Sequence, residues 1–394
     1  MTLTLRQVRE SPPDSGNGKT QTMTESKPYR VLSLDGGGMR GVYTASYLEE
    51  LAAGFARQRN VGTLDVGAMF DLIVGTSVGG INACALAAGV PLGRMVALFR
   101  DDGAQIFSRR IPEKSRVSWK SPLPSVGFAC ALVGDHLGRP SSLRTGEDAL
   151  RETLRVCFGA ETLAQVHKRR GIALAITAVE LGRGKSWVFK TAHNSGSNGR
   201  DDDTLLVDVC LATSAAPIYR SIAAIEYGKG RSKATRYFVD GGLWANNPVL
   251  VALLEAAGLA EPEQKIQVFS LGTCPRPSGE APGISERHRG LAGWKFGGEA
   301  ASLAIDAQQF AYDNMARMLS QHISHGCTVV RFPSDSIPAS LAPFLALDET
   351  SDEAMEAIIN QAKADASFTN STCNDPTSAD GALIRKLFAD SNPA

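Results

Sequence analysis

The sequence has no excess charge of either sign and no patterned cysteines. Its 41 lysines and arginines balance 41 aspartates and glutamates. The composition therefore does not support a DNA- or RNA-binding protein. The seven cysteines are scattered without a CxxC pair, which argues against a disulfide framework or a zinc site. A reducing compartment, the cytoplasm, is therefore expected.

Long uninterrupted hydrophobic runs are also missing. The polar start MTLTLRQVRESPPDSGNGKT has no apolar core of the kind found in a signal peptide. Residues 72–93 carry no charge, but several glycines and Pro91 interrupt them. They predict a strand, a turn and a helix rather than a membrane span, and we expect a soluble protein.

The composition is that of a globular protein built from alternating strands and helices. Hydrophobic residues make up 43% and charged residues 21% of the 394 residues, which excludes a disordered chain. Apolar periodicity predicts strands at 29–34, 70–75, 172–180, 185–190, 236–240 and 265–273, and helices at 42–58, 78–88, 145–157, 204–214, 247–258, 298–320, 352–365 and 380–389. This alternation predicts a mostly parallel sheet with helices on both faces.

Three segments are expected to differ from this regular alternation. Residues 1–27 are rich in small polar residues and predict a disordered leader, with Met23 as an alternative start. Residues 105–142 are the least regular part and predict a lid or an insertion within a core domain over residues 28–275. Residues 276–394 predict a helical extension packed on the same domain, with a polar linker before a last short amphipathic helix.

The hexapeptide GTSVGG at residues 75–80 follows an apolar strand and opens a helix. This is the context of a nucleophile elbow with Ser77 at its tip, and the sharp turn requires tiny neighbours such as Gly75 and Gly79. The helix N-terminus behind Ser77 presents backbone N–H groups and a positive dipole end, which favour developing negative charge. The alternative is a serine that only caps the helix.

A second glycine-rich turn, DGGGMRG at residues 35–41, also joins a strand to a helix. Successive glycines leave their N–H groups uncovered, so the loop could cradle a phosphate or an oxyanion. Gly36, Gly38 and Gly41 match the G-x-G-x-x-G dinucleotide pattern, but no acidic residue closes a second strand about 20 residues later. Arg40 is expected either to brace the glycine loop or to meet a negative charge of the substrate.

A third motif, FVDGG at residues 238–242, ends a strand with an aspartate. Asp240 stands at the C-terminal end of its strand beside Gly241 and Gly242, where α/β sheets build their functional sites. An ordinary Asp-Gly turn is the alternative interpretation.

Taken together, the three motifs resemble those of the patatin-like phospholipases. DGGGMRG, GTSVGG and DGG occur in that family's order and on the same kinds of elements, and residues 213–217 are similar to its segment before the final strand. The resemblance covers roughly residues 29–275. It implies an α/β fold of three layers, an α/β/α sandwich with a mostly parallel central sheet and a nucleophile elbow, resembling the α/β-hydrolases.

The resemblance also implies a catalytic dyad rather than a triad, and a lipid acyl hydrolase of the phospholipase A type. It makes Ser77 the nucleophile, Asp240 the base, and the amides of Gly36, Gly37 and Gly38 the oxyanion hole. The supporting residues would be Arg40, Gly75, Gly79, Gly241 and Gly242. Ester-linked fatty acids of membrane phospholipids would be cleaved through an acyl-enzyme, which needs no metal or other cofactor.

A histidine in the catalytic machinery is the less favoured arrangement. His322 and His325 fall late in the chain, as a triad histidine could, but the surrounding SQHISHG indicates a helix end. The dyad is therefore preferred. An isolated aspartate is a weak base, with an ordinary pKa of about 3.9, so a dyad of Ser77 and Asp240 requires partial desolvation of the carboxylate.

One segment predicts contact with a membrane surface. Residues 105–133 carry five lysines or arginines against one glutamate, interleaved with apolar residues, a pattern suited to an anionic bilayer. The alternative is a solvated insertion whose aromatic residues pack on the core. In the membrane interpretation, the protein lies at the inner face of the membrane when it is active.

The sequence leaves several hypotheses about function. The first is a stand-alone lipid acyl hydrolase. Some cytosolic bacterial members of the family are switched on by cyclic oligonucleotides in anti-phage defence, and this chain is similar to them in length and in its long C-terminal helical part. A cyclic di- or trinucleotide would then be a partner, sensed by residues 105–142 and 276–394. A non-lipid esterase and a non-catalytic binding protein are less favoured, and the sequence leaves a homo-oligomer open.

Overall fold

The computed structural model describes residues 26–107, 124–193, 199–228, 233–274, 298–333 and 338–393, with Gly283, Arg287, His288, Gly290 and Trp294 between residues 274 and 298. The strands are β1 (Tyr29–Leu34), β2 (Leu72–Thr76), β3 (Ala173–Glu180), β4 (Lys185–Lys190), β5 (Ala223–Tyr227), β6 (Ala234–Asp240), β7 (Ile266–Leu271) and β8 (Cys327–Phe332). The helices are α1 (Gly41–Gln58), α2 (Val78–Ala88), α3 (Leu92–Ile106), α4 (Pro124–Phe158), α5 (Leu163–Arg170), α6 (Leu206–Thr213), α7 (Gly242–Ala245), α8 (Val249–Leu259), α9 (Gly298–Ser320), α10 (Asp352–Asn374) and α11 (Ala379–Ala389).

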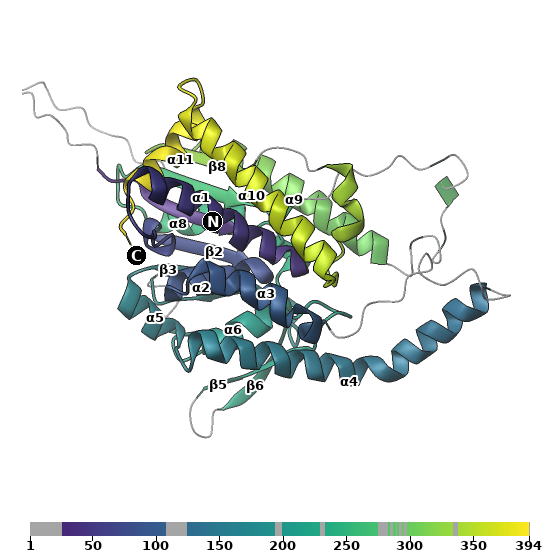
Figure 1. The fold of residues 1–394 in the computed structure, drawn as a ribbon. Coiled ribbons are helices and arrows are strands. Elements are labelled where there is room, and N and C mark those ends of the chain that lie inside the picture. The colour runs from purple at the N-terminus through teal and green to yellow at the C-terminus, as the bar shows by residue number, and fades with distance from the viewer. Residues whose placement is uncertain are drawn as a thin grey trace, which may run out of the picture.

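All these strands belong to one sheet, in the order β5-β6-β3-β2-β1-β7-β8 with β4 paired to β3 (Figure 1). The neighbours β3, β2, β1, β7 and β8 are parallel, whereas β4, β5 and β6 pair antiparallel. The predicted mostly parallel sheet is confirmed. Because the parallel strands share one direction, the turns after β1, β2 and β7 all emerge at the same edge of the sheet.

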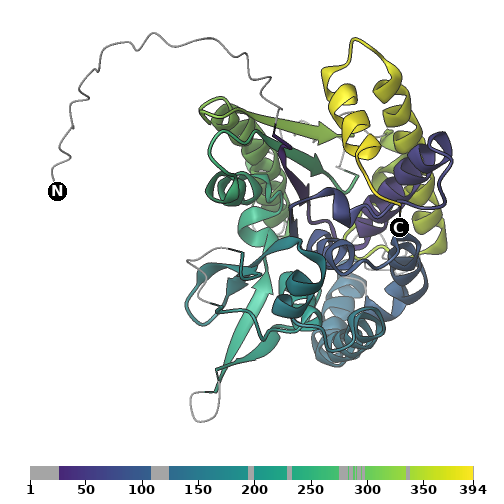
Figure 2. The same cartoon turned by 90° about the vertical axis from the view of Figure 1, so that its left-hand side faces the viewer.

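Helices cover both faces of this sheet, so the predicted α/β/α sandwich is confirmed (Figure 2). Alternate side chains of the central strands build a separate apolar core on each face, because successive residues of a strand point in opposite directions. Leu32 and Ile73 join the core beneath α1, α2, α6 and α10. Val31 and Val74 join the core beneath α8 and α9.

The chain beyond residue 275 adds to the same sheet and the same helical layers. β8 pairs with β7, α9 packs on α8, and α10 packs along α1 (Figure 1). The predicted polar linker after residue 365 is wrong over most of its length, because α10 continues to Asn374. Ala366, Thr369 and Cys373 are buried in this added part, so small side chains keep the helix packed where polar composition had indicated a linker.

Residues 124–142 are also more regular than the sequence predicts, since they form the first half of α4, with Pro140 inside the helix. The rest of the predicted lid, residues 108–123, and the leader residues 1–25 lie outside the described residues. The lid function stays a prediction. Among the helices that the structure describes, none combines the length and apolar character that crossing a bilayer requires.

Candidate active site

Ser77 and Asp240 meet because β2 and β6 end against the same edge of β3. β2 pairs with the first part of β3 up to Thr177, and Ser77 follows directly after β2. β4 pairs along the other edge of β3, up to Glu180. β6 also pairs with Ala178–Glu180 of β3, so it must lie on the same edge as β2. β6 runs antiparallel to β3 and ends at Asp240, opposite Ala178. The two strand ends therefore face each other at adjacent positions of β3.

Ser77 occupies a strained and tightly packed turn between β2 and α2. Its φ of 56° lies in a region that residues other than glycine rarely adopt. A β carbon at Gly75 would lie 2.4 Å from the carbonyl oxygen of Gly79, and one at Gly79 would lie 2.4 Å from that of Leu34. Both glycines are thus required by close backbone approach, and the strained serine is typical of a functional turn.

The two candidate side chains form a short hydrogen-bonded pair. The Ser77 hydroxyl donates to Oδ2 of Asp240 at 2.7 Å, and the Gly242 amide donates to Oδ1 at 2.6 Å. Burial raises the pKa of Asp240 to about 6, although the hydrogen bonds from Gly242 and Ser77 act to lower it. The carboxylate is therefore more basic than an ordinary aspartate and remains mostly ionised at neutral pH.

Thr213, at the end of α6, holds both members of this pair in place. Its hydroxyl accepts a hydrogen bond of 2.8 Å from the Ser77 amide, and its carbonyl oxygen accepts one from the Gly241 amide. The Asp240 amide donates to the carbonyl oxygen of Ala215. Residues 213–217, which resemble a family segment, therefore hold the turns that carry Ser77 and Asp240. The sequence alone did not reveal this role.

The glycine loop after β1 lies against Ser77, and two of its backbone amides have no hydrogen-bond acceptor among the described residues. A β carbon at Gly36 would lie 3.2 Å from Cβ of Ser77. The Gly36 amide donates a hydrogen bond of 2.8 Å to the carbonyl oxygen of Asn246, so it is not free to bind an oxyanion, contrary to prediction. The amides of Gly37 and Gly38 donate no hydrogen bond to any described residue, and these two can still serve an oxyanion.

Arg40 braces the glycine loop, which is one of the two roles expected for it from the sequence. The side chain is buried and donates to the carbonyl oxygens of Gly37 and Cys274, each at 3.1 Å. These bonds tie the glycine loop to the end of β7.

The histidines do not join the pair within the described part of the chain. Both carboxylate oxygens of Asp240 already accept hydrogen bonds, from Ser77 and from Gly242. His322 and His325 follow α9, as the helix-end interpretation predicts, and neither bonds to the pair. Across the described residues, no group of three His, Cys, Asp or Glu side chains is arranged to hold a metal ion.

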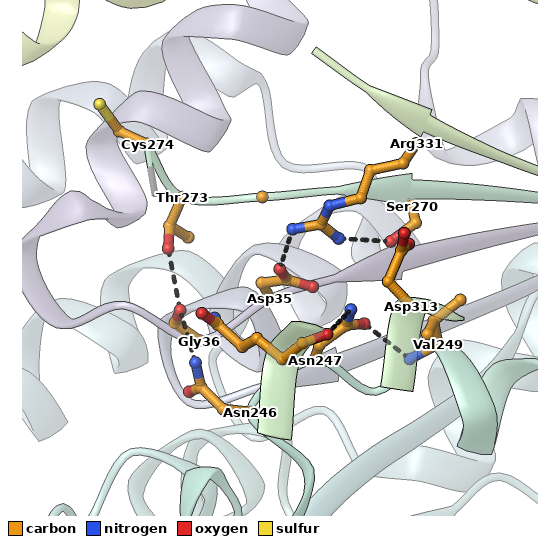
Figure 3. Close-up of polar contacts among 12 residues, drawn as sticks. Asp35, Gly36, Asn246, Asn247, Val249, Ser270, Thr273, Cys274, Asp313 and Arg331 are labelled. Atoms are coloured by element: carbon orange, nitrogen blue, oxygen red, sulfur yellow. Dashed lines mark hydrogen bonds and ion pairs between the residues drawn. The ribbon is translucent and has the colours of Figure 1, made fainter. Parts of the chain in front are cut away.

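Several polar residues that fix the site carry no recognisable sequence signal. Thr273 donates from its hydroxyl to the Gly36 carbonyl oxygen at 2.8 Å, and Asn246 holds both the N–H and the C=O of Gly36 (Figure 3). Both residues follow β-strand ends in the chain, after β7 and after β6. Position at the C-terminal edge of the sheet is the only hint that the sequence offers for them.

The fold and the site together have the parts expected of an esterase of the α/β/α class. A strained serine on a strand-to-helix turn, a basic buried carboxylate and unbonded glycine amides are the parts that acyl transfer requires. The model of the family "Patatin-like phospholipase" matches residues 32–253, more than half of the chain. This chain belongs to that family.

Three curated relatives extend the similarity beyond the family region. A "cGAMP-activated phospholipase" of Escherichia coli is 32% identical over 343 residues, 85% of this chain and 87% of the relative. Proteins with the same name from Pseudomonas aeruginosa and Vibrio cholerae are 33% and 31% identical and cover 75% and 85% of this chain. The alignments span 76% and 89% of those two relatives, so they include most of each protein.

Proposed function

We propose that this chain releases ester-linked fatty acids from membrane phospholipids, with Ser77 as nucleophile and Asp240 as general base. The observation that carries the proposal is the hydrogen bond of 2.7 Å from the Ser77 hydroxyl to a buried carboxylate. In the first step Asp240 takes the hydroxyl proton while Ser77 Oγ bonds to the ester carbonyl carbon. The amides of Gly37 and Gly38 bind the resulting oxyanion.

The second half of the reaction returns the enzyme to its starting state. Protonated Asp240 gives its proton to the leaving lysolipid oxygen, and the fatty acyl group stays on Ser77 as an ester. Asp240 then takes a proton from water as the water attacks the acyl carbon, and the proton returns to Ser77 Oγ when the fatty acid leaves. No step requires a second titrating side chain.

Two exposed apolar side chains that lie close in the sequence to Asp240 or to its supporting segment suit an approach by lipid. Leu243 follows Gly242 directly and is 53% exposed, and Ile218 follows the 213–217 segment and is 62% exposed. Exposed apolar residues that cluster at a site favour contact with an apolar partner. The predicted basic membrane segment, residues 105–133, lies largely outside the described residues, and its role stays a prediction.

A second candidate function adds a switch to the same chemistry. The three relatives named for activation by cGAMP align with at least three quarters of this chain, and this observation favours a cyclic dinucleotide as activator. In that case the protein acts as an effector in anti-phage defence, and it attacks the inner face of the cell's own membrane when the nucleotide appears. A cyclic trinucleotide is the other ligand to compare.

Fatty-acid release from vesicles of bacterial phospholipid tests both candidates. Wild type and Ser77→Ala are compared with no nucleotide, with cGAMP, and with a set of other cyclic di- and trinucleotides. Release by wild type without nucleotide supports a constitutive enzyme, and release only with one nucleotide supports the switch. Equal release by Ser77→Ala would remove Ser77 from the mechanism.

A further inference from the structure

Two side chains from beyond the family-matched region help to hold the glycine loop in place. The family match ends at residue 253, whereas Gln308 lies on α9 and Arg331 lies on β8. Neither residue touches the dyad directly. Gln308 acts on the loop from Asp35 to Gly38 through Asn246, whereas Arg331 bonds directly to Asp35 at its start.

Gln308 fixes the turn that follows Asp240. Its Oε1 accepts from the Asn246 amide and its Nε2 donates to the Trp244 carbonyl oxygen, both at 3.0 Å. Only one orientation of the Gln308 amide satisfies both bonds, because one partner is a donor and the other an acceptor. The side chain therefore holds two peptide groups of the turn at once.

Asn246 passes this constraint to the glycine loop. Its carbonyl oxygen accepts from the Gly36 amide at 2.8 Å. Its Nδ2 donates to the Gly36 carbonyl oxygen at 3.4 Å (Figure 3). The peptide groups on both sides of Gly36 are thereby fixed. The orientation of the next amide, that of Gly37, depends on these neighbours because peptide groups are planar.

Arg331 holds the other end of the same loop. It donates to Oδ2 of Asp35 at 2.6 Å and to the Ser270 hydroxyl at 2.8 Å (Figure 3). Asp35 is fully buried, and a charge-assisted bond to a guanidinium that is itself held by Ser270 restricts the movement of this carboxylate. The loop is thus anchored by β8 on the Asp35 side and by α9, through Asn246, on the Gly36 side.

We infer that Gln308 and Arg331 are positioning residues for the oxyanion hole, so that the C-terminal part of the chain sets the catalytic rate. This inference rests on the proposed function, because it assigns the oxyanion to the amides of Gly37 and Gly38. Loss of one oxyanion donor lowers kcat by about 10²–10³-fold. Displacement of a donor is milder, and we expect about a 10- to 100-fold loss of kcat on loss of the Gln308 bridge.

The test compares Gln308→Leu with the matched control Gln309→Leu. The two glutamines are adjacent on α9, but Gln309 offers only its backbone carbonyl oxygen to Asn247, which a side-chain change preserves. The measurements are kcat and KM on a soluble p-nitrophenyl ester, with active sites counted by fluorophosphonate labelling of Ser77, and the pH profile of kcat/KM. Counting active sites separates a slower site from a smaller folded fraction.

We expect Gln308→Leu to lower kcat per labelled site, with KM changed less than about threefold and the pH midpoint unchanged. Gln309→Leu should match wild type. Equal kcat per labelled site in the two variants would overturn the inference. If Gln308→Leu does not fold, Gln308→Glu replaces it, because glutamate keeps the acceptor for Asn246 but has no donor for Trp244; wild-type kcat in that variant would also overturn the inference.

Arg331 gives an independent arm with rescue by a conservative variant. Arg331→Met should lower kcat per labelled site more than Arg331→Lys, which keeps a cation for Asp35. Equal losses in both would count against positioning by charge. Because the ester and the phosphonate report on Ser77 rather than on lipid choice, intact labelling without release of fatty acid from vesicles would refute only the phospholipid assignment.

Discussion

Replacing the proposed base should make the protein more stable while it destroys activity. Burial raises the pKa of Asp240 from an ordinary value of 3.8 to about 6. The folded protein therefore binds the Asp240 proton more tightly than the unfolded chain does. The stabilisation from this tighter proton binding is fully present below about pH 4. It is lost as the pH rises to about 6, because a charged carboxylate must then stay buried.

The size of the effect follows from the two pKa values. A difference of about two units corresponds to about 3 kcal/mol against folding at pH 8, and to about half of that at pH 5. Asparagine removes the charge but can keep both hydrogen bonds, since its Oδ1 can accept from Gly242 and its Nδ2 can donate to Ser77. Asp240→Asn should therefore raise the free energy of unfolding by up to these amounts.

Thermal melts at pH 5 and pH 8 measure this difference. With an unfolding entropy of about 2.1 cal/mol/K per residue over 394 residues, we expect Asp240→Asn to melt about 3–4 °C above wild type at pH 8. The gain at pH 5 should be about half as large. Ester hydrolysis should fall about 10²–10⁴-fold, the usual contribution of a general base.

Ser77→Ala is the matched control for these melts. It abolishes the reaction as well, but it leaves the Asp240 charge buried with one hydrogen bond fewer, so it should melt at or below the wild-type temperature at pH 8. A lower melting temperature for Asp240→Asn than for wild type at pH 8 would refute the claim that the folded protein holds a costly charge at this position. A gain independent of pH would refute the titration.

Three further predictions concern the same site. The value of kcat/KM should rise about tenfold per pH unit below pH 6 and level off above it, because only ionised Asp240 accepts the Ser77 proton; a flat profile between pH 5 and 8 would contradict this. Gly38→Ala should abolish most ester hydrolysis, since the residue has a φ of 59° and a β carbon would lie 2.5 Å from the Leu347 carbonyl oxygen; wild-type kcat would show that this amide is dispensable. Thr213→Val should lower the free energy of unfolding by about 1–3 kcal/mol, because the buried Ser77 amide loses its acceptor, whereas Thr213→Ser should behave as wild type in urea unfolding.

The fold could be predicted from the sequence where local pattern and tertiary burial agree. The strand over 29–34 and the helices over 78–88 and 298–320 have the predicted bounds, because their apolar residues recur at the spacing that the packed faces require. α10 runs nine residues past its predicted end at residue 365. There, alanine, threonine and cysteine pack against α1, and such small or polar side chains give a weak hydrophobic pattern.

The candidate site shows the same division between local and long-range information. Ser77, Asp240 and the glycine loop lie in turns whose shape requires glycine, so these turns can be recognised as glycine-containing motifs in the sequence. The bond from the Gly36 amide to Asn246 depends on how two distant turns meet across the sheet edge, and no local pattern encodes it. Gln308 lies on an ordinary amphipathic helix, and only the packing of α9 against the turn after β6 gives it a task.

In the proposed dyad, the surroundings of the aspartate take over the part that the histidine plays in a triad. In a triad the imidazole, with an ordinary pKa of about 6.5, takes the serine proton, and the aspartate only orients it. Here burial raises the pKa of Asp240 itself to about 6, so this single carboxylate is nearly as basic as an imidazole. The Gly242 amide fixes the orientation of Asp240, as the aspartate of a triad orients the histidine. Water admitted around Asp240 would return its pKa toward 3.8 and weaken the base, so the burial of Asp240 belongs to the proposed chemistry as much as the carboxylate does.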